Sequence, residues 1–199
     1  MDYQIFRIIN RLAGHWGIVD LLMILIARYG PIVFAMLLAV LWFSGAGDDA
    51  VLRRKTVLRA AISAVLALGF NQLIGLVYFR PRPFATHEVK LLLPKSGDPS
   101  FPSDHSTGAA ALTASAFGAT RLATWGMTAM SVLLVISRVY VGLHYPLDVL
   151  GGAITGILSS FLVRYIWVHL DPWAVKLMEL WDRVWVLVFP GRAPGRSDV

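Results

Sequence analysis

The chain has 199 residues, of which 57% are hydrophobic and only 15% are charged. Soluble globular domains carry roughly 25% charged residues, so this composition argues against an ordinary cytosolic enzyme, a disordered protein or a coiled coil. The chain has no cysteine, which excludes disulfides, cysteine-ligated zinc and a thiol nucleophile. A net charge of +6 could indicate nucleic-acid binding in a soluble protein, but in a membrane protein the position of each charge matters more. We therefore expect a membrane protein with no nucleic-acid partner.

The first hydrophobic stretch, residues 18–43, is interrupted by the sequence RYGP at residues 28–31. Proline removes a backbone donor and disfavours the helical conformation of the residue before it, so we expect a break there. We place the first span at about residues 30–45, after an N-terminal helix over residues 2–27 that lies at the interface or is angled into it. The alternative is one kinked span over residues 18–43. Because the N-terminus lacks the features of a cleavable signal peptide, we expect the spans to be permanent.

Further segments are long and apolar enough to be membrane helices. Two of them form a predicted hairpin around Arg121, and the last contains small residues that let helices approach closely. After these, residues 171–188 repeat tryptophan and aliphatic residues at helical spacing, which predicts an amphipathic helix at the interface. We expect an all-α integral membrane protein with a bundle of about five to six transmembrane helices, in one domain over residues 1–190 before a disordered tail at 191–199. The predicted later spans are residues 57–79, 107–119, 122–136 and 147–168.

Basic residues predict the orientation of the bundle, because cytoplasmic connections are enriched in lysine and arginine. Most of the dispensable positive charges fall in the predicted loop after the first span, in the short turn of the hairpin and near the C-terminus. We place these charges in the cytoplasm, so the connections over residues 80–105 and around His144 face outward. The cytoplasmic charges are Arg53, Arg54, Lys55, Arg121, Arg164, Lys176, Arg183, Arg192 and Arg196.

A histidine and an aspartate lie where the last predicted span begins. His144 and Asp148 are four residues apart, with Pro146 suited to the first helical turn, so both side chains can lie on one face. A carboxylate beside an imidazole fixes its tautomer and leaves the other ring nitrogen free to attack. Arg138, at the end of the preceding span, offers a planar fork of donors to an anion. These residues favour a nucleophilic histidine. The simpler alternative is a structural His–Asp hydrogen bond beside an interfacial arginine.

Two more polar clusters lie at the outer ends of predicted spans. Ser103 can cap a helix that begins at about Asp104, and the free N–H groups of that helix attract anions. His105, in the first turn, is well placed to protonate a leaving oxygen. Arg80 and Arg82 are each followed by proline, which holds the backbone extended, and their guanidinium groups suit a phosphate better than a carboxylate. The alternatives are an ordinary capped helix and, above all for Arg80, an anchor to lipid headgroups.

The three clusters in this order resemble the signature of the type 2 phosphatidic acid phosphatase superfamily. The resemblance extends over residues 71–148, and it consists of RP at 82–83, PSDH at 102–105, and SR at 137–138 followed by His144 and Asp148. The sequence FPSDH is most similar to bacterial undecaprenyl-diphosphate phosphatases of the bacitracin-resistance type. The resemblance implies a membrane enzyme that hydrolyses undecaprenyl diphosphate on the outer face of the bacterial inner membrane. Phosphatidylglycerophosphate, phosphatidate and lipid A phosphate are alternative substrates.

The resemblance also implies a role for each residue. His144 would attack phosphorus and form a phosphohistidine, with Asp148 orienting its ring, and His105 would protonate the leaving group and later activate water. No metal and no cofactor is implied. The family's first motif usually opens with a lysine seven residues before its Arg-Pro, and Gly75 stands there in this chain. Arg80, Lys90 or Lys95 would then supply the missing charge. The predicted phosphate-binding residues are Arg80, Arg82, Ser103 and Arg138.

Two other classes of protein would use the same residues differently. An anion transporter would distribute charged groups through the membrane depth, often with internal repeats, whereas here the polar groups gather at one side. A metal-dependent hydrolase would use His105, His144 and Asp148 as ligands, and a chelator would then abolish its activity.

Overall fold

The computed structural model describes residues 1–189, and all regular structure in that part of the chain is helical. Four segments in it are long and apolar enough to cross a membrane: Gly17–Phe43, Gly47–Val77, Leu122–Tyr140 and Pro146–Val188. The prediction of an all-α, multi-pass membrane protein is confirmed, but four candidate spans stand where about five to six are predicted, because the helix at the predicted span 107–119 has only 13 residues. The elements are α1 (Asp2–Asn10), α2 (Gly17–Phe43), α3 (Gly47–Val77), α4 (Pro83–Thr86), α5 (Asp104–Ala116), the π-helical η1 (Leu122–Gly126), α6 (Met127–Tyr140) and α7 (Pro146–Val188).

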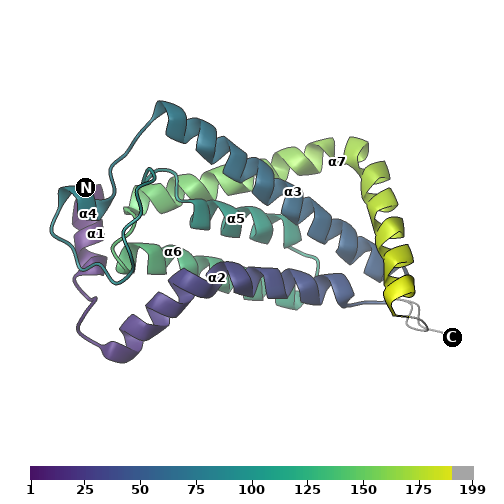
Figure 1. Ribbon diagram of the computed structural model, residues 1–199, viewed down its shortest axis with the longest axis horizontal. Coiled ribbons are helices and arrows are strands. Elements are labelled where there is room, and N and C mark those ends of the chain that lie inside the picture. The colour runs from purple at the N-terminus through teal and green to yellow at the C-terminus, as the bar shows by residue number, and fades with distance from the viewer. Residues whose placement is uncertain (190–199) are drawn as a thin grey trace.

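The helices that run side by side as a bundle (Figure 1) are α2, α3, α5, α6 and α7. Helix α5 packs between α3 and α7, and α2 packs against α6. The predicted hairpin is confirmed as α5 followed by η1 and α6. Helix α3 begins ten residues before the predicted span at residue 57, so Arg53, Arg54 and Lys55 are helical rather than in a loop. Apolar composition marks the part of a helix inside the membrane, and polar turns can extend beyond it.

The N-terminal prediction is wrong and its alternative is right. Helix α2 is continuous from Gly17 to Phe43 with Pro31 inside it, whereas the N-terminal helix covers only residues 2–10. Membrane helices tolerate an internal proline because neighbouring helices compensate for the lost hydrogen bond. Gly30 brings such a neighbour close, since a Cβ there would lie 2.8 Å from Leu134 Cδ1 of α6.

The last helix also differs from the prediction. The span and the amphipathic helix are one helix, α7, with Pro172 inside it, and its C-terminal part bends across the end of the bundle where α2 ends and α3 begins (Figure 1). Two ion pairs of 2.8 Å join this helix to the start of α3, between Lys55 and Asp171 and between Arg54 and Asp182. The predicted disordered tail lies outside the described residues.

Aromatic side chains gather beside these ion pairs. Trp42 and Phe43, at the end of α2, contact Trp181 on α7 at ring-centroid distances of 5.7 and 6.2 Å, and Phe43 contacts Trp185 at 5.5 Å. We call these four residues the aromatic cluster. Tryptophan favours the level of the lipid headgroups, so the cluster marks a membrane interface at this end of the bundle.

Small residues let α5 and α7 pack closely, as the sequence predicts. A Cβ at Gly152 would lie 2.8 Å from Thr107 Oγ1, and one at Gly156 would lie 2.7 Å from the backbone nitrogen of Ala111. Ordinary contacts of a Cβ begin at about 3.4 Å. Helix α5 therefore lies where only glycine on α7 allows it, and this packing sets the position of the first turn of α5.

Candidate active site

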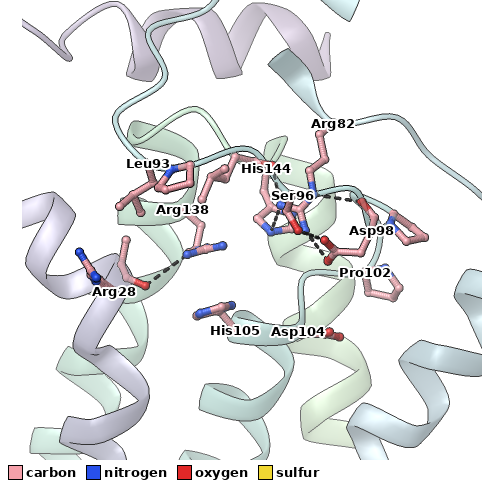
Figure 2. Close-up of a pocket in the computed structure, with 14 residues that line it drawn as sticks. Arg28, Arg82, Leu93, Ser96, Asp98, Pro102, Asp104, His105, Arg138 and His144 are labelled. Carbon is pink, nitrogen blue, oxygen red and sulfur yellow. Dashed lines mark hydrogen bonds and ion pairs between the residues drawn. The ribbon is translucent and has the colours of Figure 1, made fainter. Parts of the chain in front are cut away.

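One cavity of about 400 Å³ opens at the end of the bundle where α5 and α7 begin. Its walls come from α2, the segment between α4 and α5, the first turn of α5, and the end of α6 (Figure 2). Of the predicted site residues, the structure brings four to this cavity. They are Arg82, His105, Arg138 and His144.

His144 is held in one tautomer. Its Nδ1 lies 2.8 Å from the backbone oxygen of Ser100, and a carbonyl oxygen can only accept, so Nδ1 carries the proton. Nε2 then has a free lone pair, which accepts a hydrogen bond of 3.1 Å from Arg82 Nη1. The ring is only 2% exposed, and this burial lowers the pKa of His144 below its ordinary value. The imidazole is therefore neutral at pH 7, with its lone pair directed at the arginine that lines the cavity.

Asp148 supports His144 through an intermediate residue rather than directly. The distance from His144 Nδ1 to Asp148 Oδ2 is 3.8 Å, too long for a hydrogen bond. Asp148 Oδ2 instead accepts hydrogen bonds from the Ser100 hydroxyl and from the backbone N–H of Tyr145, the latter at 2.8 Å. The carboxylate fixes Ser100, and the carbonyl of Ser100 fixes the imidazole. The structure has no direct hydrogen bond between His144 and Asp148, and it is Ser100, which the sequence did not reveal, that links the two side chains.

Arg80 does not line the cavity. Its guanidinium donates to Asp148 Oδ1 at 2.6 Å and to Asp2, at the start of α1, and it lies over the ring of Tyr145 at 4.3 Å from the centroid. The structure thus places Arg80 behind His144, where it neutralises the buried Asp148. Lys90 and Lys95 do not line the cavity either.

Arg82 is engaged by an acidic residue of the loop before α5. Its Nη2 lies 2.7 Å from Asp98 Oδ2, and its Nε donates to the backbone oxygen of Asp98 at 3.1 Å. Asp98 is more than half exposed, and its second oxygen accepts a hydrogen bond from Ser96. The carboxylate occupies the donors that an anionic ligand of Arg82 would use.

Arg138 and His105 form the opposite wall of the cavity. Arg138 Nη1 donates to the backbone oxygen of Ala27 at 3.2 Å, while its buried Nε has no hydrogen-bond partner among the described residues. Burial first, and then the charges of Arg138 and His144, lower the pKa of His105 to about 3. Figure 2 shows Arg28 on α2 at the end of the cavity beyond Arg138. This wall offers guanidinium donors and a neutral imidazole.

Ser103 occupies the N-cap position of α5, but the predicted capping hydrogen bond is absent. Its hydroxyl is buried and has no partner within residues 1–189, and Ser103 is not among the residues that line the cavity. The neighbouring carboxylate of Asp104 accepts a hydrogen bond of 2.7 Å from Asn71 of α3 and points away from His105 (Figure 2). Asn71 also donates to Thr107 at 2.8 Å. These contacts hold the Asp104 carboxylate on the side of the first turn of α5 that faces α3.

The described part of the chain contains no group of three or more His, Asp or Glu side chains that could hold a metal ion.

A model of the family described as "PAP2 superfamily" matches residues 56–171. The chain belongs to the PAP2 superfamily. It is 40% identical to the undecaprenyl-diphosphatase BcrC of Bacillus subtilis, over 92% of this chain and 93% of the relative. The predicted family and the predicted enzyme class, a lipid phosphatase, are confirmed.

Two solved PAP2-like structures have the same fold. LpxE of Aquifex aeolicus has a TM-score of 0.68 at 23% identity, covering 82% of this chain and 94% of that one. A PAP2 type phosphatidylglycerolphosphate phosphatase of Bacillus subtilis has a TM-score of 0.57 at 25% identity, covering 82% and 85%. All the predicted site residues lie within the PAP2 match, whereas Arg28 and the Asp2 that pairs with Arg80 lie outside it.

Proposed function

We propose that the protein hydrolyses undecaprenyl diphosphate to undecaprenyl phosphate and inorganic phosphate through a phosphohistidine intermediate. The observation that carries this proposal is the unprotonated Nε2 of His144, at the wall of a cavity also lined by Arg82, Arg138 and His105. Its lone pair attacks once the hydrogen bond from Arg82 is released. Identity of 40% to an undecaprenyl-diphosphatase, over nearly the whole of both chains, supports the choice of substrate.

In the first step, Nε2 of His144 attacks the terminal phosphorus. The N–P bond forms as the bond from phosphorus to the bridging oxygen breaks, and undecaprenyl phosphate leaves with the electron pair. Arg82 and Arg138, which line the cavity, donate to the equatorial oxygens, on which charge accumulates in the transition state. Ser103, whose buried hydroxyl has no partner in the described residues, is the further phosphate-binding residue that the family resemblance implies. Asp98 must first release Arg82, because its carboxylate and the phosphate need the same donors.

In the second step, a water molecule attacks the phosphohistidine. His105 accepts a proton from the water, the N–P bond breaks, and the electron pair returns to His144. A neutral imidazole is the form that can accept this proton, which agrees with the lowered pKa of His105. Inorganic phosphate then leaves, and Arg82 can pair with Asp98 again.

The protonation state of His105 favours a diphosphate over a phosphate ester of an alcohol. An alkoxide is a poor leaving group and needs a proton from a general acid. A lipid phosphate leaves as a stable anion, since a phosphate monoester has its second pKa at about 6. A site whose histidine has a pKa of about 3 before the substrate binds is therefore better suited to the diphosphate.

Asp148, Arg80 and Ser100 form the support of the nucleophile in this proposal. Arg80 neutralises Asp148, Asp148 fixes Ser100, and Ser100 holds the proton-bearing nitrogen of His144. Arg80 thus acts through other residues, and we assign it positioning rather than phosphate binding.

The substrate's long prenyl tail stays in the bilayer, so the catalytic groups must lie at the level of the headgroups. The cavity is at one end of the bundle, and the basic residues at the start of α3 are at the other (Figure 1). By the positive-inside rule this arrangement supports an active site on the outer face of the bacterial inner membrane. We assign residues 1–190 to one phosphatase domain.

Phosphate release from purified protein tests the proposal. Wild type should hydrolyse undecaprenyl diphosphate, and His144→Ala should be inactive while it keeps the wild-type melting temperature and elution volume. Phosphatidylglycerophosphate, phosphatidate and lipid A phosphate are the competing substrates in the same assay. A higher kcat/KM for any of them would overturn the assignment of undecaprenyl diphosphate as the substrate. Turnover by His144→Ala would overturn the mechanism. Loss of activity in a chelator, restored by zinc, would show a metal-dependent reaction instead.

A further inference from the structure

A second polar cavity, of about 230 Å³, lies between the first half of α3, the end of α5 and the middle of α7. It is separated from the active site by the length of α5, which is about 15–20 Å at 1.5 Å per residue. We call it the distal pocket, and the polar residues on its walls are Thr56, Arg59, Ser115, Ser160 and Arg164.

The distal pocket holds two positive charges and no acidic residue among those that line it. Arg59 donates through Nη2 to Thr56 and contacts the ring of Trp167 at 5.7 Å, but its buried Nε has no hydrogen-bond partner. Arg164 is exposed and has neither a hydrogen bond nor an ion pair within residues 1–189. Two neighbouring guanidinium groups with unused donors repel one another and are stabilised by an anion between them.

The carboxylate that acts on Arg59, that of Asp171, already accepts hydrogen bonds from other residues. Asp171 acts on Arg59 through space, but one of its oxygens accepts from Lys55 at 2.8 Å and the other from Trp167 Nε1 at 2.9 Å. The serine hydroxyls of the pocket donate to other groups of the protein. The free hydrogen-bond donors of the pocket are therefore those of the two arginines.

The rim of the distal pocket shows which anion would fit. Leu52, Phe117 and Phe161 surround it, and each is at least 60% exposed. On a membrane protein such side chains face lipid, so a ligand that enters here brings acyl chains with it. Basic pockets between transmembrane helices at the cytoplasmic side bind anionic lipid headgroups.

We propose that the distal pocket binds the phosphate of an anionic phospholipid, in the leaflet opposite the active site, between Arg59 and Arg164. This proposal does not depend on which lipid the active site hydrolyses. Inorganic phosphate carries the same chemical group, but it has no chains to contact the apolar rim.

The test measures lipid binding to purified protein by native mass spectrometry and by the melting temperature in detergent. The ligands are phosphatidylglycerol, the zwitterionic phosphatidylcholine and inorganic phosphate. Phosphatidylglycerol should bind and raise the melting temperature more than phosphatidylcholine does. Arg164→Gln should weaken its binding about tenfold, because a charge-assisted contact is lost. Arg121→Gln removes a charge at the same end of the bundle but outside the pocket, and it should bind like wild type.

Arg164→Gln should retain wild-type phosphatase activity in detergent, which shows that it folds, and Arg59→Gln provides a second variant of the same pocket. Equal binding of the two phospholipids would overturn the proposal. An equal loss of phosphatidylglycerol binding in Arg164→Gln and Arg121→Gln would also overturn it. Inorganic phosphate should also bind the active site, so a rise in melting temperature with inorganic phosphate is assigned to the distal pocket only if Arg164→Gln abolishes that rise. If Arg164→Gln abolishes it and phosphatidylglycerol does not bind, the ligand of the pocket is soluble phosphate and the lipid proposal is overturned.

Discussion

Adding one methyl group at Gly156 should separate His105 from His144, the two histidines that we propose to be catalytic, without touching either of them. In Gly156→Ala the new Cβ would lie 2.7 Å from the backbone nitrogen of Ala111 and closer still to the carbonyl of Thr107. Both neighbours belong to the backbone of α5, so neither can rotate out of the way. Helix α5 must move away from α7, and it carries His105 with it.

The size of the effect follows from this geometry. To restore ordinary contacts, α5 has to move by about 1 Å, and a misplacement of 1 Å can reduce a rate about 100-fold. Overpacking lowers the free energy of unfolding by about 1–3 kcal/mol, and the better helix propensity of alanine offsets up to about 1 kcal/mol of this loss. The variant should therefore fold, melt slightly earlier, and lose most of its kcat.

The assay is phosphate release under saturating substrate, together with a thermal melt in detergent. Gly108→Ala is the matched control, because it lies on α5 itself and nothing is within 4 Å of its added Cβ. Gly108→Ala should keep wild-type kcat. If Gly156→Ala also turned over at the wild-type rate, the position of α5 would not control the chemistry, and the link between helix packing and catalysis would be refuted.

Three further outcomes are expected. Asp98→Asn should lower KM about two- to fivefold with kcat unchanged, because the substrate no longer competes with a carboxylate for Arg82, and a raised KM would contradict this. Asp148→Asn should lower kcat by about 10²–10⁴-fold, yet retain more activity than His144→Ala, and it should melt earlier because its buried ion pair is broken; an intact rate would contradict its supporting role. Acidification below pH 6.5 should destabilise the fold, since both histidines have a lowered pKa when folded and bind protons more readily when unfolded. This stability is fully present above pH 6.5. For His105 it falls by about 1.4 kcal/mol per pH unit, and His144 acts in the same direction, so melts from pH 7.5 to 5 should show a decline that His105→Gln reduces. A melting temperature that rises on acidification would show that the pKa shifts have the opposite sign.

The sequence predicted the parts of this protein that depend on composition and on side-chain chemistry. Apolar runs located α3, α6 and α7, and the glycines of α7 predicted a close helix contact. Costly ionisable groups at helix ends predicted the cavity that joins Arg82, His105, Arg138 and His144. These features can be predicted from the sequence because each depends on the type of side chain at a given position.

What the sequence could not predict depends on backbone atoms and on distant partners. Ser100 positions His144 through its carbonyl oxygen, a group that every residue has. Arg80 pairs with Asp2, which is 78 residues away in the sequence. That contact helps to hold the Arg80 guanidinium outside the cavity rather than in it. Pro31 breaks an isolated helix, but the neighbouring helix stabilises it here, and no local pattern contains that information.

The aromatic cluster and the cavity lie at opposite ends of rigid helices, so the protein has a fixed hydrophobic length. Helix α3, with 31 residues, is about 45 Å long, whereas the hydrocarbon core of a bilayer is about 30 Å thick. With its tryptophans anchored at one surface, the depth of the catalytic cavity at the other surface depends on how thick the host membrane is. The protein should then hydrolyse its lipid phosphate at different rates in bilayers of short and long acyl chains, because lipid thickness sets how far the phosphate group must rise to reach His144.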